Sequence, residues 1–242
     1  MLNKIKQAVI LCAGLGTRLR PITDTIPKPM LPILGKPLLE WNIENFKKHG
    51  VTEFFINLHY LPDVIKNYFG DGSKLGVKIN YFFEPVILGT AGGIKSFENK
   101  LNDAFFLIYG DMLSLVDYSK MAEEFSKKAD AVGMQRMQKT DKYADADVAE
   151  LAADGSFAKI HPKPHTEQYP NAYRMKGIFI LKKDILGFIP KDTFYELGKN
   201  LLPEVVNSGK KFYSYECEDY SKGIDTEDKW KEVEAYLKTG GR

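Results

Sequence analysis

Residues 8–19 read AVILCAGLGTRL, in which a run of six apolar residues leads into two glycines and an arginine. The apolar run Ala8–Ala13 predicts a strand that is buried on both faces, as in a parallel sheet. Glycine lets a backbone come close to a ligand, and ligands of open α/β sheets bind beyond the carboxyl ends of the strands. We therefore expect the backbone around Gly14 and Gly16 to cradle a phosphate chain, with Arg18 as its cationic partner.

This glycine pair is weak evidence when taken alone. A dinucleotide fingerprint needs a third glycine where this chain has Leu19, and a Walker loop needs Gly-Lys-Ser/Thr, which is absent. By these rules a phosphate loop and an ordinary strand-to-loop turn are about equally good interpretations. The missing glycine also argues against a nicotinamide- or flavin-dependent Rossmann oxidoreductase.

The following segment strengthens the phosphate interpretation. Residues 27–37 read PKPMLPILGKP and contain four prolines, which predict a stiff, extended path instead of a helix. Lys28 stands between two of these prolines. A lysine on a solvated surface needs no such frame, whereas an ammonium that must stay against a phosphate benefits from it.

The rest of the chain alternates short apolar runs with amphipathic stretches, which predicts a wound α/β sheet. Strands are expected at residues 8–13, 53–58, 77–83, 104–109, 131–135, 148–151, 157–160, 177–181 and 211–215. Helices are expected at residues 38–49, 63–68, 91–99, 118–128, 200–208 and 226–237. We expect one domain over residues 1–242, with a nucleotide-binding half up to about residue 130 and an acceptor-binding half from about 131 to 242.

Composition narrows the choice of partners and location. The 34 basic and 32 acidic residues nearly cancel, so the sequence gives no reason to expect a nucleic acid or a membrane as partner. The two cysteines form no CxxC pair, which leaves no basis for a disulfide framework or a zinc site. The N-terminal apolar run is too short for a signal peptide, so a cytoplasmic location is expected.

The combined motifs resemble the signature of sugar-phosphate nucleotidyltransferases. They are Ala13-Gly-x-Gly-Thr-Arg-Leu-x-Pro21, Pro27-Lys-Pro-Met-Leu-Pro32 and Gly35-Lys-Pro37, followed by Glu84, Gly89-Thr-Ala-Gly-Gly93, Asp111 and Lys163-Pro164. Similar enzymes are the mannose-1-phosphate and heptose-1-phosphate guanylyltransferases and the muramate-1-phosphate uridylyltransferase. The resemblance covers almost the whole chain. It implies a Rossmann-like three-layer α/β sandwich with a mixed, mostly parallel central sheet.

The resemblance also implies the reaction and its residues. A nucleoside monophosphate would pass from a nucleoside triphosphate to a sugar 1-phosphate, with Arg18 stabilising the pyrophosphate and Lys28 bridging the reacting phosphates. Asp111 and Asp225 would bind Mg²⁺. The nucleotide would be lined by Leu11, Ala13, Gly14, Gly16, Thr17, Glu84, Gly89 and Thr90, and the sugar phosphate by Lys163, Lys176 and Gly177. Such a transfer needs positioning and charge neutralisation, and no general base.

The sequence departs from the family pattern at two places. The usual C-terminal metal motif reads Asp-x-Gly-Thr, whereas residues 223–226 read Gly-Ile-Asp-Thr. Around the acceptor, the expected glycine, glutamate and asparagine are replaced by Asp147, Pro162 and Met175. These changes favour an unusual sugar 1-phosphate or another phosphorylated polyol, with Lys176 as a substitute contact.

The base and the activity leave alternatives open. The Gly-Thr-Ala-Gly-Gly loop and residues 110–113 favour GTP and a mannose- or heptose-type acceptor, with UTP as the second choice and CTP as a third. A non-catalytic nucleotide-sugar sensor on the same fold is the competing hypothesis. A homodimer is compatible with the sequence.

Overall fold

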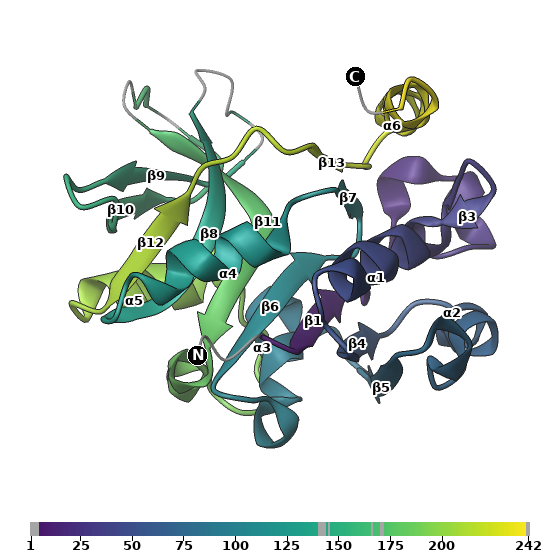
Figure 1. The fold of residues 1–242 in the computed structure, drawn as a ribbon, viewed down its shortest axis with the longest axis horizontal. Helices are drawn as coiled ribbons and strands as arrows, with labels where there is room; N and C mark the ends of the chain where they lie inside the picture. The colour runs from purple at the N-terminus through teal and green to yellow at the C-terminus, as the bar shows by residue number, and fades with distance from the viewer. Residues whose placement is uncertain (1–4, 140–143, 145, 166, 170–171, 241–242) are drawn as a thin grey trace. The chain divides into compact units, whose positions relative to one another are not determined.

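The structure is a computed structural model that describes residues 5–139, 144, 146–165, 167–169 and 172–240 (Figure 1). The chain divides into two compact units, each built from separated stretches of sequence. We call residues 4–87, 108–119 and 218–242 the loop unit, because they contain the glycine loop. Residues 1–3, 88–107 and 120–217 form the hairpin unit. The division does not test the single-domain prediction or its two halves, which stay predictions.

The loop unit contains a parallel sheet whose strands end in step. Strand β1 (Gln7–Leu11) pairs with β4 (Glu53–Leu58), and β4 pairs with β5 (Lys78–Phe83). Leu11 lies opposite Asn57, and Leu58 lies opposite Phe83. The segments that follow the three strands therefore meet at one edge of the sheet, which is where ligands bind in such sheets.

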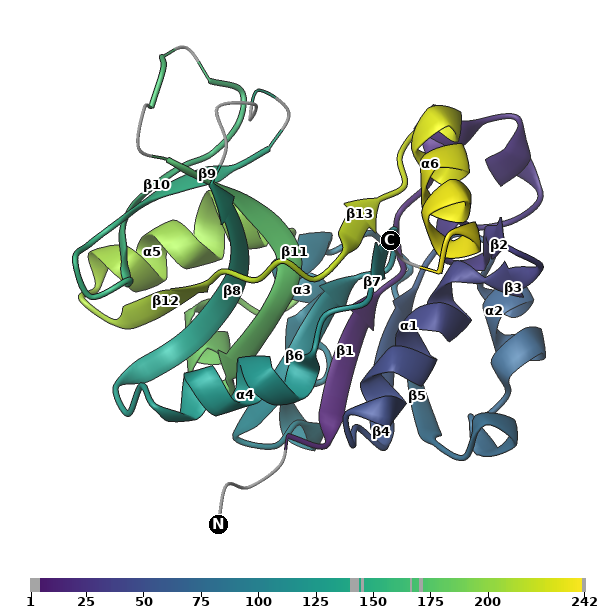
Figure 2. The same cartoon turned by 45° about the horizontal axis from the view of Figure 1, so that its top comes forward.

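The loop unit also contains helices and two small sheets. The helices are α1 (Leu38–Lys48), α2 (Pro62–Phe69) and α6 (Glu227–Lys238). Two small antiparallel sheets pair β2 (Pro32–Ile33) with β3 (Lys36–Pro37) and β7 (Met112–Ser114) with β13 (Ser221–Gly223). Figure 2 shows β13 beside β7, with α6 following it. These pairings were not predicted from the sequence.

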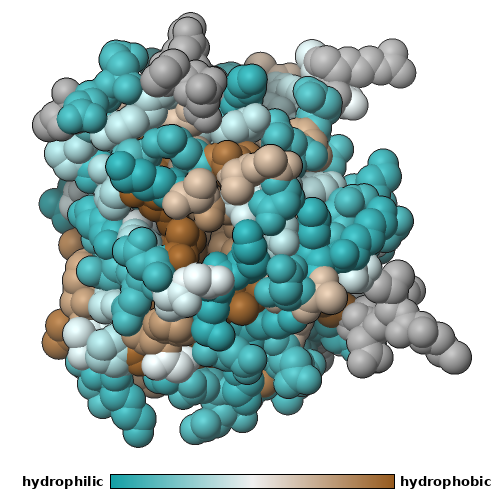
Figure 3. All heavy atoms as spheres, turned by 90° about the vertical axis from the view of Figure 1, so that its left-hand side faces the viewer, coloured by the Kyte–Doolittle hydropathy of each residue, from teal (hydrophilic) through white to brown (hydrophobic). Residues whose placement is uncertain are grey.

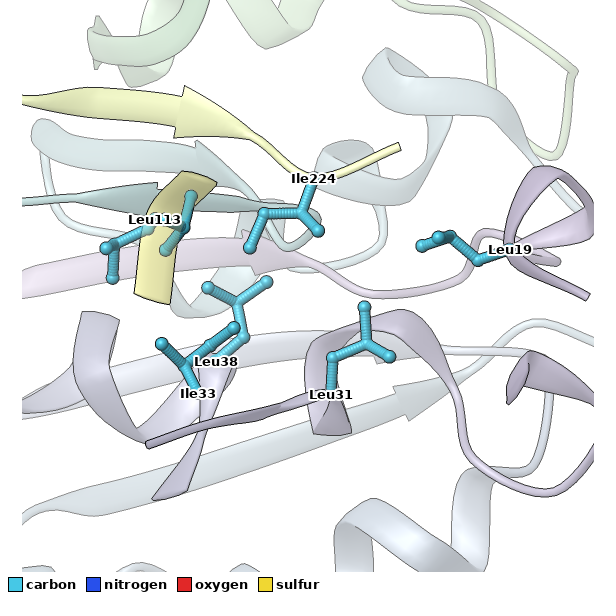
Figure 4. Close-up of a cluster of buried hydrophobic side chains, with 7 residues drawn as sticks. Leu19, Leu31, Ile33, Leu38, Leu113 and Ile224 are labelled. Carbon is cyan, nitrogen blue, oxygen red and sulfur yellow. The ribbon is translucent and has the colours of Figure 1, made fainter. Parts of the chain in front are cut away.

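A buried apolar cluster fixes the proline-rich segment to the rest of the loop unit (Figure 4). Its members come from the loop after β1, from the proline-rich segment up to and including β2, from α1 and β7, and from the turn before α6 and α6 itself; they are Leu19, Leu31, Ile33, Leu38, Leu113, Ile224 and Val233. Burying one such side chain contributes about 1.5–3 kcal/mol. Trp230 Nε1 adds a hydrogen bond to the carbonyl oxygen of Pro32 at 2.9 Å. The loop is therefore held by packing as well as by its prolines.

The hairpin unit has strands of mixed direction. Strand β8 (Ala131–Lys139) pairs in parallel with β12 (Lys211–Tyr215) and antiparallel with β11 (Tyr173–Lys182). β9 (Val148–Leu151) forms a hairpin with β10 (Phe157–His161) and also pairs with β11. The helices are α3 (Gly89–Lys95), α4 (Tyr118–Ser126), whose first two residues belong to the loop unit, and α5 (Leu202–Asn207), preceded by a π-helical turn at Leu197–Leu201. β6 (Ala104–Tyr109) has residues in both units.

The predicted mixed α/β class is confirmed, and several strands have the predicted bounds. The prediction that residues 27–37 are extended and not helical was wrong at Lys28–Met30, which forms a short 3₁₀ turn. Two further 3₁₀ turns, Thr17–Leu19 and Ile22–Asp24, precede this segment. Pro29 tolerates a helical turn because it lies in the first turn, where its missing N–H would have no helical partner. The helix predicted at residues 200–208 begins earlier, at the π-helical turn.

The described helices give no sign of a membrane segment. None of them is both long and apolar enough to cross a bilayer. The face drawn in Figure 3 carries mainly hydrophilic side chains around a smaller hydrophobic area.

Candidate functional site

The two glycines of the loop after β1 have different surroundings. Gly16 has a φ of 70°, and a Cβ there would lie 3.2 Å from side-chain atoms of both Lys28 and Thr23. Thr23 Oγ1 also donates a hydrogen bond to the Gly16 carbonyl oxygen at 2.8 Å. A Cβ on Gly14, by contrast, would meet nothing within 4 Å, and Gly14 is exposed. Gly16 thus allows the loop to close over Lys28, while Gly14 leaves open space for a ligand.

The flanking loop residues become more exposed along the chain after β1. Leu11 ends β1 and is half-buried, and Ala13 is 7% exposed. Thr17 and Arg18 are exposed within the 3₁₀ turn that follows Gly16. The predicted nucleotide-binding loop therefore runs from the sheet core to the surface at the carboxyl end of β1.

A buried polar chain supports this loop from below. Cys12 N donates to Asn57 Oδ1 at 2.8 Å, and Asn57 Nδ2 donates to Glu84 Oε1 at 2.7 Å. His59 Nδ1 lies 2.7 Å from the Glu84 carbonyl oxygen. Glu84 is 0% exposed and Asn57 is 2% exposed. Because buried polar groups are costly without partners, this hydrogen-bond network fixes the ends of β1, β4 and β5 relative to one another.

This arrangement bears on one predicted role and adds one residue. Glu84 was predicted to line the nucleotide, whereas its carboxylate contacts Asn57 in the interior. Direct nucleotide contact by Glu84 stays a prediction. Asn57 was not singled out from the sequence, although a polar residue near the end of an apolar strand is a signal that could have revealed it.

Lys28 and Asp111 are brought together as the resemblance implied. Lys28 Nζ lies 3.4 Å from Asp111 Oδ2. The Lys28 side chain is 9% exposed and that of Asp111 is 40% exposed. A buried ammonium requires a partner of opposite charge. The pair thus places a largely desolvated cation beside a carboxylate that solvent and ligands can still reach.

The backbone of Asp111 is fixed against the end of β1. Gly110 N donates to the Leu11 carbonyl oxygen at 2.9 Å, and a Cβ on Gly110 would lie 2.6 Å from that oxygen. Ile224 N donates to the Asp111 carbonyl oxygen at 2.7 Å, next to the pairing of β13 with β7. The backbone that carries Asp225 therefore runs alongside the backbone that carries Asp111.

Asp225 links the glycine loop to helix α6. Its Oδ2 lies 2.5 Å from an Arg18 guanidinium nitrogen, and its Oδ1 lies 2.6 Å from Lys229 Nζ. Burial raises the pKa of Asp225, but the hydrogen bond from Lys229 and the charges of Lys229 and Arg18 together hold the pKa below its ordinary value. Thr226 caps α6 by accepting a hydrogen bond from Lys229 N. Asp225 is thus ionised near neutral pH and held at the start of the helix.

The donor set is compatible with a metal ion that arrives with a nucleotide. Among the residues that the structure describes, no group of three or more His, Cys, Asp or Glu side chains is placed to hold a metal. Mg²⁺ commonly takes one or two carboxylates together with substrate phosphates and waters. Asp111 and Asp225, on adjacent backbones beside the glycine loop, meet that requirement. The Mg²⁺ prediction itself is not tested.

Gly89 and Thr90, which were predicted to line the nucleotide, lie in the hairpin unit. Gly89 has a φ of 76°, and a Cβ there would lie 2.7 Å from the Tyr195 carbonyl oxygen. Thr90 Oγ1 accepts a hydrogen bond from Leu197 N at 2.8 Å. Gly89 therefore has a packing reason of its own, and the nucleotide-binding role of both residues stays a prediction.

The predicted sugar-phosphate residues also lie in the hairpin unit. Lys163 is exposed, and its backbone N donates to Asp147 Oδ1 at 3.0 Å. Lys176 and Gly177 fall where the register between β11 and β8 shifts. Gln135 Nε2 donates to the Lys176 carbonyl oxygen at 2.7 Å and supports this irregular backbone. Their contact with a sugar phosphate stays a prediction, and so does the choice of Lys176 as a substitute contact.

Comparison with known proteins finds similar sequences over most of the chain. The sequence pattern of the family described as nucleotidyl transferase matches residues 7–235. The UTP–glucose-1-phosphate uridylyltransferase of Synechocystis sp. is 35% identical over 221 residues, which cover 86% of this chain and 57% of that protein. The D-glycero-α-D-manno-heptose 1-phosphate guanylyltransferase of Campylobacter jejuni is 38% identical over 180 residues, which cover 74% of this chain and 77% of that protein.

Solved structures show the same fold. The crystal structure of HddC from Yersinia pseudotuberculosis is similar with a TM-score of 0.80 and 25% identity, over 96% of this chain and 100% of that one. The predicted nucleotide-diphospho-sugar transferase type of fold is thereby confirmed. The chain spans little more than half the length of the Synechocystis relative.

Proposed function

Because the chain belongs to the nucleotidyl transferase family, we propose that it joins a nucleoside triphosphate to a sugar 1-phosphate, giving a nucleotide-sugar and pyrophosphate. The observation that carries the proposal is the Lys28–Asp111 pair, in which a largely buried ammonium lies 3.4 Å from a half-exposed carboxylate. The pair adjoins a glycine loop that ends a parallel strand and leaves open space at Gly14. A nucleoside triphosphate requires this combination of open backbone and fixed charge.

The residues of the loop unit divide the work of the reaction. A phosphate oxygen of the sugar 1-phosphate attacks the α-phosphorus, and the bond from that phosphorus to the bridging oxygen breaks as pyrophosphate leaves. The attacking oxygen carries no proton near neutral pH, so no general base is needed. Backbone N–H groups of the glycine loop bind the phosphates, Lys28 neutralises charge between the two reacting phosphates, and Arg18 stabilises the leaving pyrophosphate.

Before a nucleotide binds, each of these two cations is paired with a carboxylate of the site. Arg18 is 65% exposed and contacts Asp225, so its guanidinium is near the loop before a nucleotide arrives. Lys28 is held by Asp111 in the same way. A Mg²⁺ ion held by Asp111 and Asp225 would neutralise charge on the phosphate oxygens. Each cation then exchanges a carboxylate partner for a phosphate of the substrate.

We further propose GTP and a mannose- or heptose-type sugar 1-phosphate as the substrates. The Campylobacter relative is named a heptose 1-phosphate guanylyltransferase, and this name supports the choice. The name of the Synechocystis relative supports UTP with glucose 1-phosphate as the alternative. We place the reaction in the cytoplasm, where nucleoside triphosphates are made.

The deciding experiment measures pyrophosphate release in the presence of Mg²⁺. Four nucleoside triphosphates are each combined with a panel of sugar 1-phosphates, with and without EDTA. We expect release only when GTP is paired with a mannose- or heptose-type acceptor, and none after EDTA. Release with UTP would keep the reaction class and change the base. No release from any pair, together with a thermal shift by a nucleotide-sugar, would favour the sensor hypothesis.

A further inference from the structure

Asp147 occupies an unusual position in the hairpin unit. Its Oδ1 accepts the backbone hydrogen bond from Lys163 at 3.0 Å, and its own carbonyl oxygen accepts one from Met175 N at 3.0 Å. Its Oδ2 lies only 2.0 Å from the point that a Cβ on Gly198 would occupy. One carboxylate therefore stands between the Lys163 backbone and the Gly198 turn, where the family pattern has a glycine with no side chain.

The turn that carries Gly198 is itself fastened to the Gly89–Thr90 loop. Leu197 N donates to Thr90 Oγ1 at 2.8 Å. Tyr195 N donates to the Leu88 carbonyl oxygen at 2.8 Å, and the Tyr195 carbonyl oxygen accepts from Ala91 N at 2.8 Å. Gly198 is buried within the π-helical turn Leu197–Leu201. Short π-helical turns of this kind often accompany functional sites. The segment 195–198 is thus a fixed support for whatever packs on it.

These contacts form a continuous path from the Gly89–Thr90 loop to Lys163. Thr90 holds Leu197, Gly198 adjoins the Asp147 carboxylate, and that carboxylate holds the Lys163 backbone. A lysine side chain is a flexible stem of four carbons, so the position of its ammonium is defined only if its backbone is fixed. A hydrogen bond from a backbone N–H to a carboxylate is charge-assisted and stronger than a neutral one. Asp147 supplies that bond from a residue anchored on both sides.

We propose that Asp147 is a positioning residue, which fixes the Lys163 backbone against the Gly198 turn and so sets where the Lys163 ammonium meets the phosphate of the acceptor. This inference rests on the proposed function, since Lys163 is taken as the acceptor-phosphate lysine. A side chain at Gly198 would have to displace the Asp147 carboxylate. The aspartate and the glycine therefore act together in this chain: removing the Asp147 acceptor oxygen, or adding a side chain at Gly198, loosens Lys163.

The kinetic test uses four variants and the GTP and α-D-mannose 1-phosphate pair, or the pair that the release panel identifies. Asp147→Ala should raise the KM of the sugar phosphate about tenfold, with kcat and the KM of the nucleotide unchanged. Asp147→Asn should stay close to the wild type, since an amide oxygen still accepts the Lys163 N–H. Gly198→Ala should resemble Asp147→Ala. The double variant should be no worse than either single one, because both remove the same contact.

Two results would overturn the proposal. One is an unchanged sugar-phosphate KM in Asp147→Ala. The other is a joint rise of both KM values with a lower melting temperature, which indicates a general structural role.

A second measurement does not depend on activity. Exchange of the Lys163 backbone amide with deuterium should become about tenfold faster in Asp147→Ala, while exchange at Val148, in the neighbouring ladder, stays unchanged. Unchanged exchange at Lys163 refutes the positioning role even if transfer is observed. If the wild type transfers with no pair, the proposed function fails, and the exchange result alone still decides whether Asp147 holds Lys163.

Discussion

Replacing Lys28 with methionine separates the role of its charge from its role in packing. Methionine has a similar length and no charge, and the Lys28 side chain is only 9% exposed, so the substitute fills nearly the same space. The ammonium is lost from beside Asp111, whose carboxylate is 40% exposed and can be solvated on its own. Lys28→Met therefore changes the charge of the site and leaves its shape almost intact.

The structure predicts opposite effects on rate and on stability. Removing one group that stabilises developing charge in a desolvated site lowers kcat about 10²–10³-fold, or about 2.7–4 kcal/mol of transition-state stabilisation. A buried apolar side chain avoids the desolvation of an ammonium, and the lost partner was a partly exposed carboxylate. The melting temperature should therefore stay the same or rise.

Pyrophosphate release and thermal unfolding, measured on the same samples, test this reasoning. Lys74→Met is the matched control, because Lys74 is an exposed lysine of the same unit and its change should affect neither measurement. Turnover of Lys28→Met near the wild-type rate would show that Lys28 takes no part in the reaction. A loss of turnover that is accompanied by a lower melting temperature would show that Lys28 is a structural residue.

Two further predictions concern the glycine loop and its ion pairs. Gly16→Ala should lower the free energy of unfolding by about 1–2 kcal/mol because of its left-handed backbone, whereas Gly14→Ala should unfold normally and raise the nucleotide KM; equal melting temperatures for both would refute the distinction. The pKa of Asp225 is lower in the folded chain than its ordinary value of 3.8. The stability from its contacts with Arg18 and Lys229 is therefore present above that ordinary value and is lost as pH falls through the folded pKa. As pH falls over that range, Asp225→Asn should lose less stability than the wild type. An identical profile of stability against pH would contradict the role given to the Asp225 ion pairs.

The parts of the site that the sequence predicted are those carried by contiguous motifs. The glycine loop, Lys28 and Asp111 stand in or after short signatures, and the structure brings Lys28 to 3.4 Å from Asp111. The strands Glu53–Leu58 and Ala104–Tyr109, whose residues are mostly apolar, also have their predicted bounds. The motifs and the strands are contiguous stretches of sequence, whereas the approach of Lys28 to Asp111 is made by the fold.

The features that were missed depend on partners far apart in the chain. Asn57 matters only because it reaches Cys12 and Glu84, and Thr23 only because it reaches Gly16. The pairing of β7 with β13 joins three-residue strands about a hundred residues apart, and such short strands have no periodicity to detect. The sequence showed Asp147 as a departure from the family pattern, but not its contact with Gly198, which lies about fifty residues further along the chain.

The exchange of aspartate and glycine in residues 223–226 can be understood from the contacts that follow the pairing of β7 with β13. Ile224 is fully buried in the apolar cluster, and Thr226 caps α6, so the segment cannot slide by one residue without losing both contacts. The carboxylate therefore sits two positions later than the Asp-x-Gly-Thr pattern places it. Gly223 has no positive φ, and a Cβ there would meet nothing within 4 Å, so an aspartate at this position is sterically free.

This freedom allows the two positions to be compared within one chain. If Asp225 is the second carboxylate for Mg²⁺, Asp225→Asn should weaken Mg²⁺ activation of pyrophosphate release, and adding Gly223→Asp should not restore it. If the usual position is the one that reaches the metal, the double variant should bind Mg²⁺ more tightly than the single one. Titration of release against Mg²⁺ distinguishes the two. Because Arg18 also depends on Asp225, rescue by Gly223→Asp would mean that the natural aspartate serves the guanidinium and not the metal.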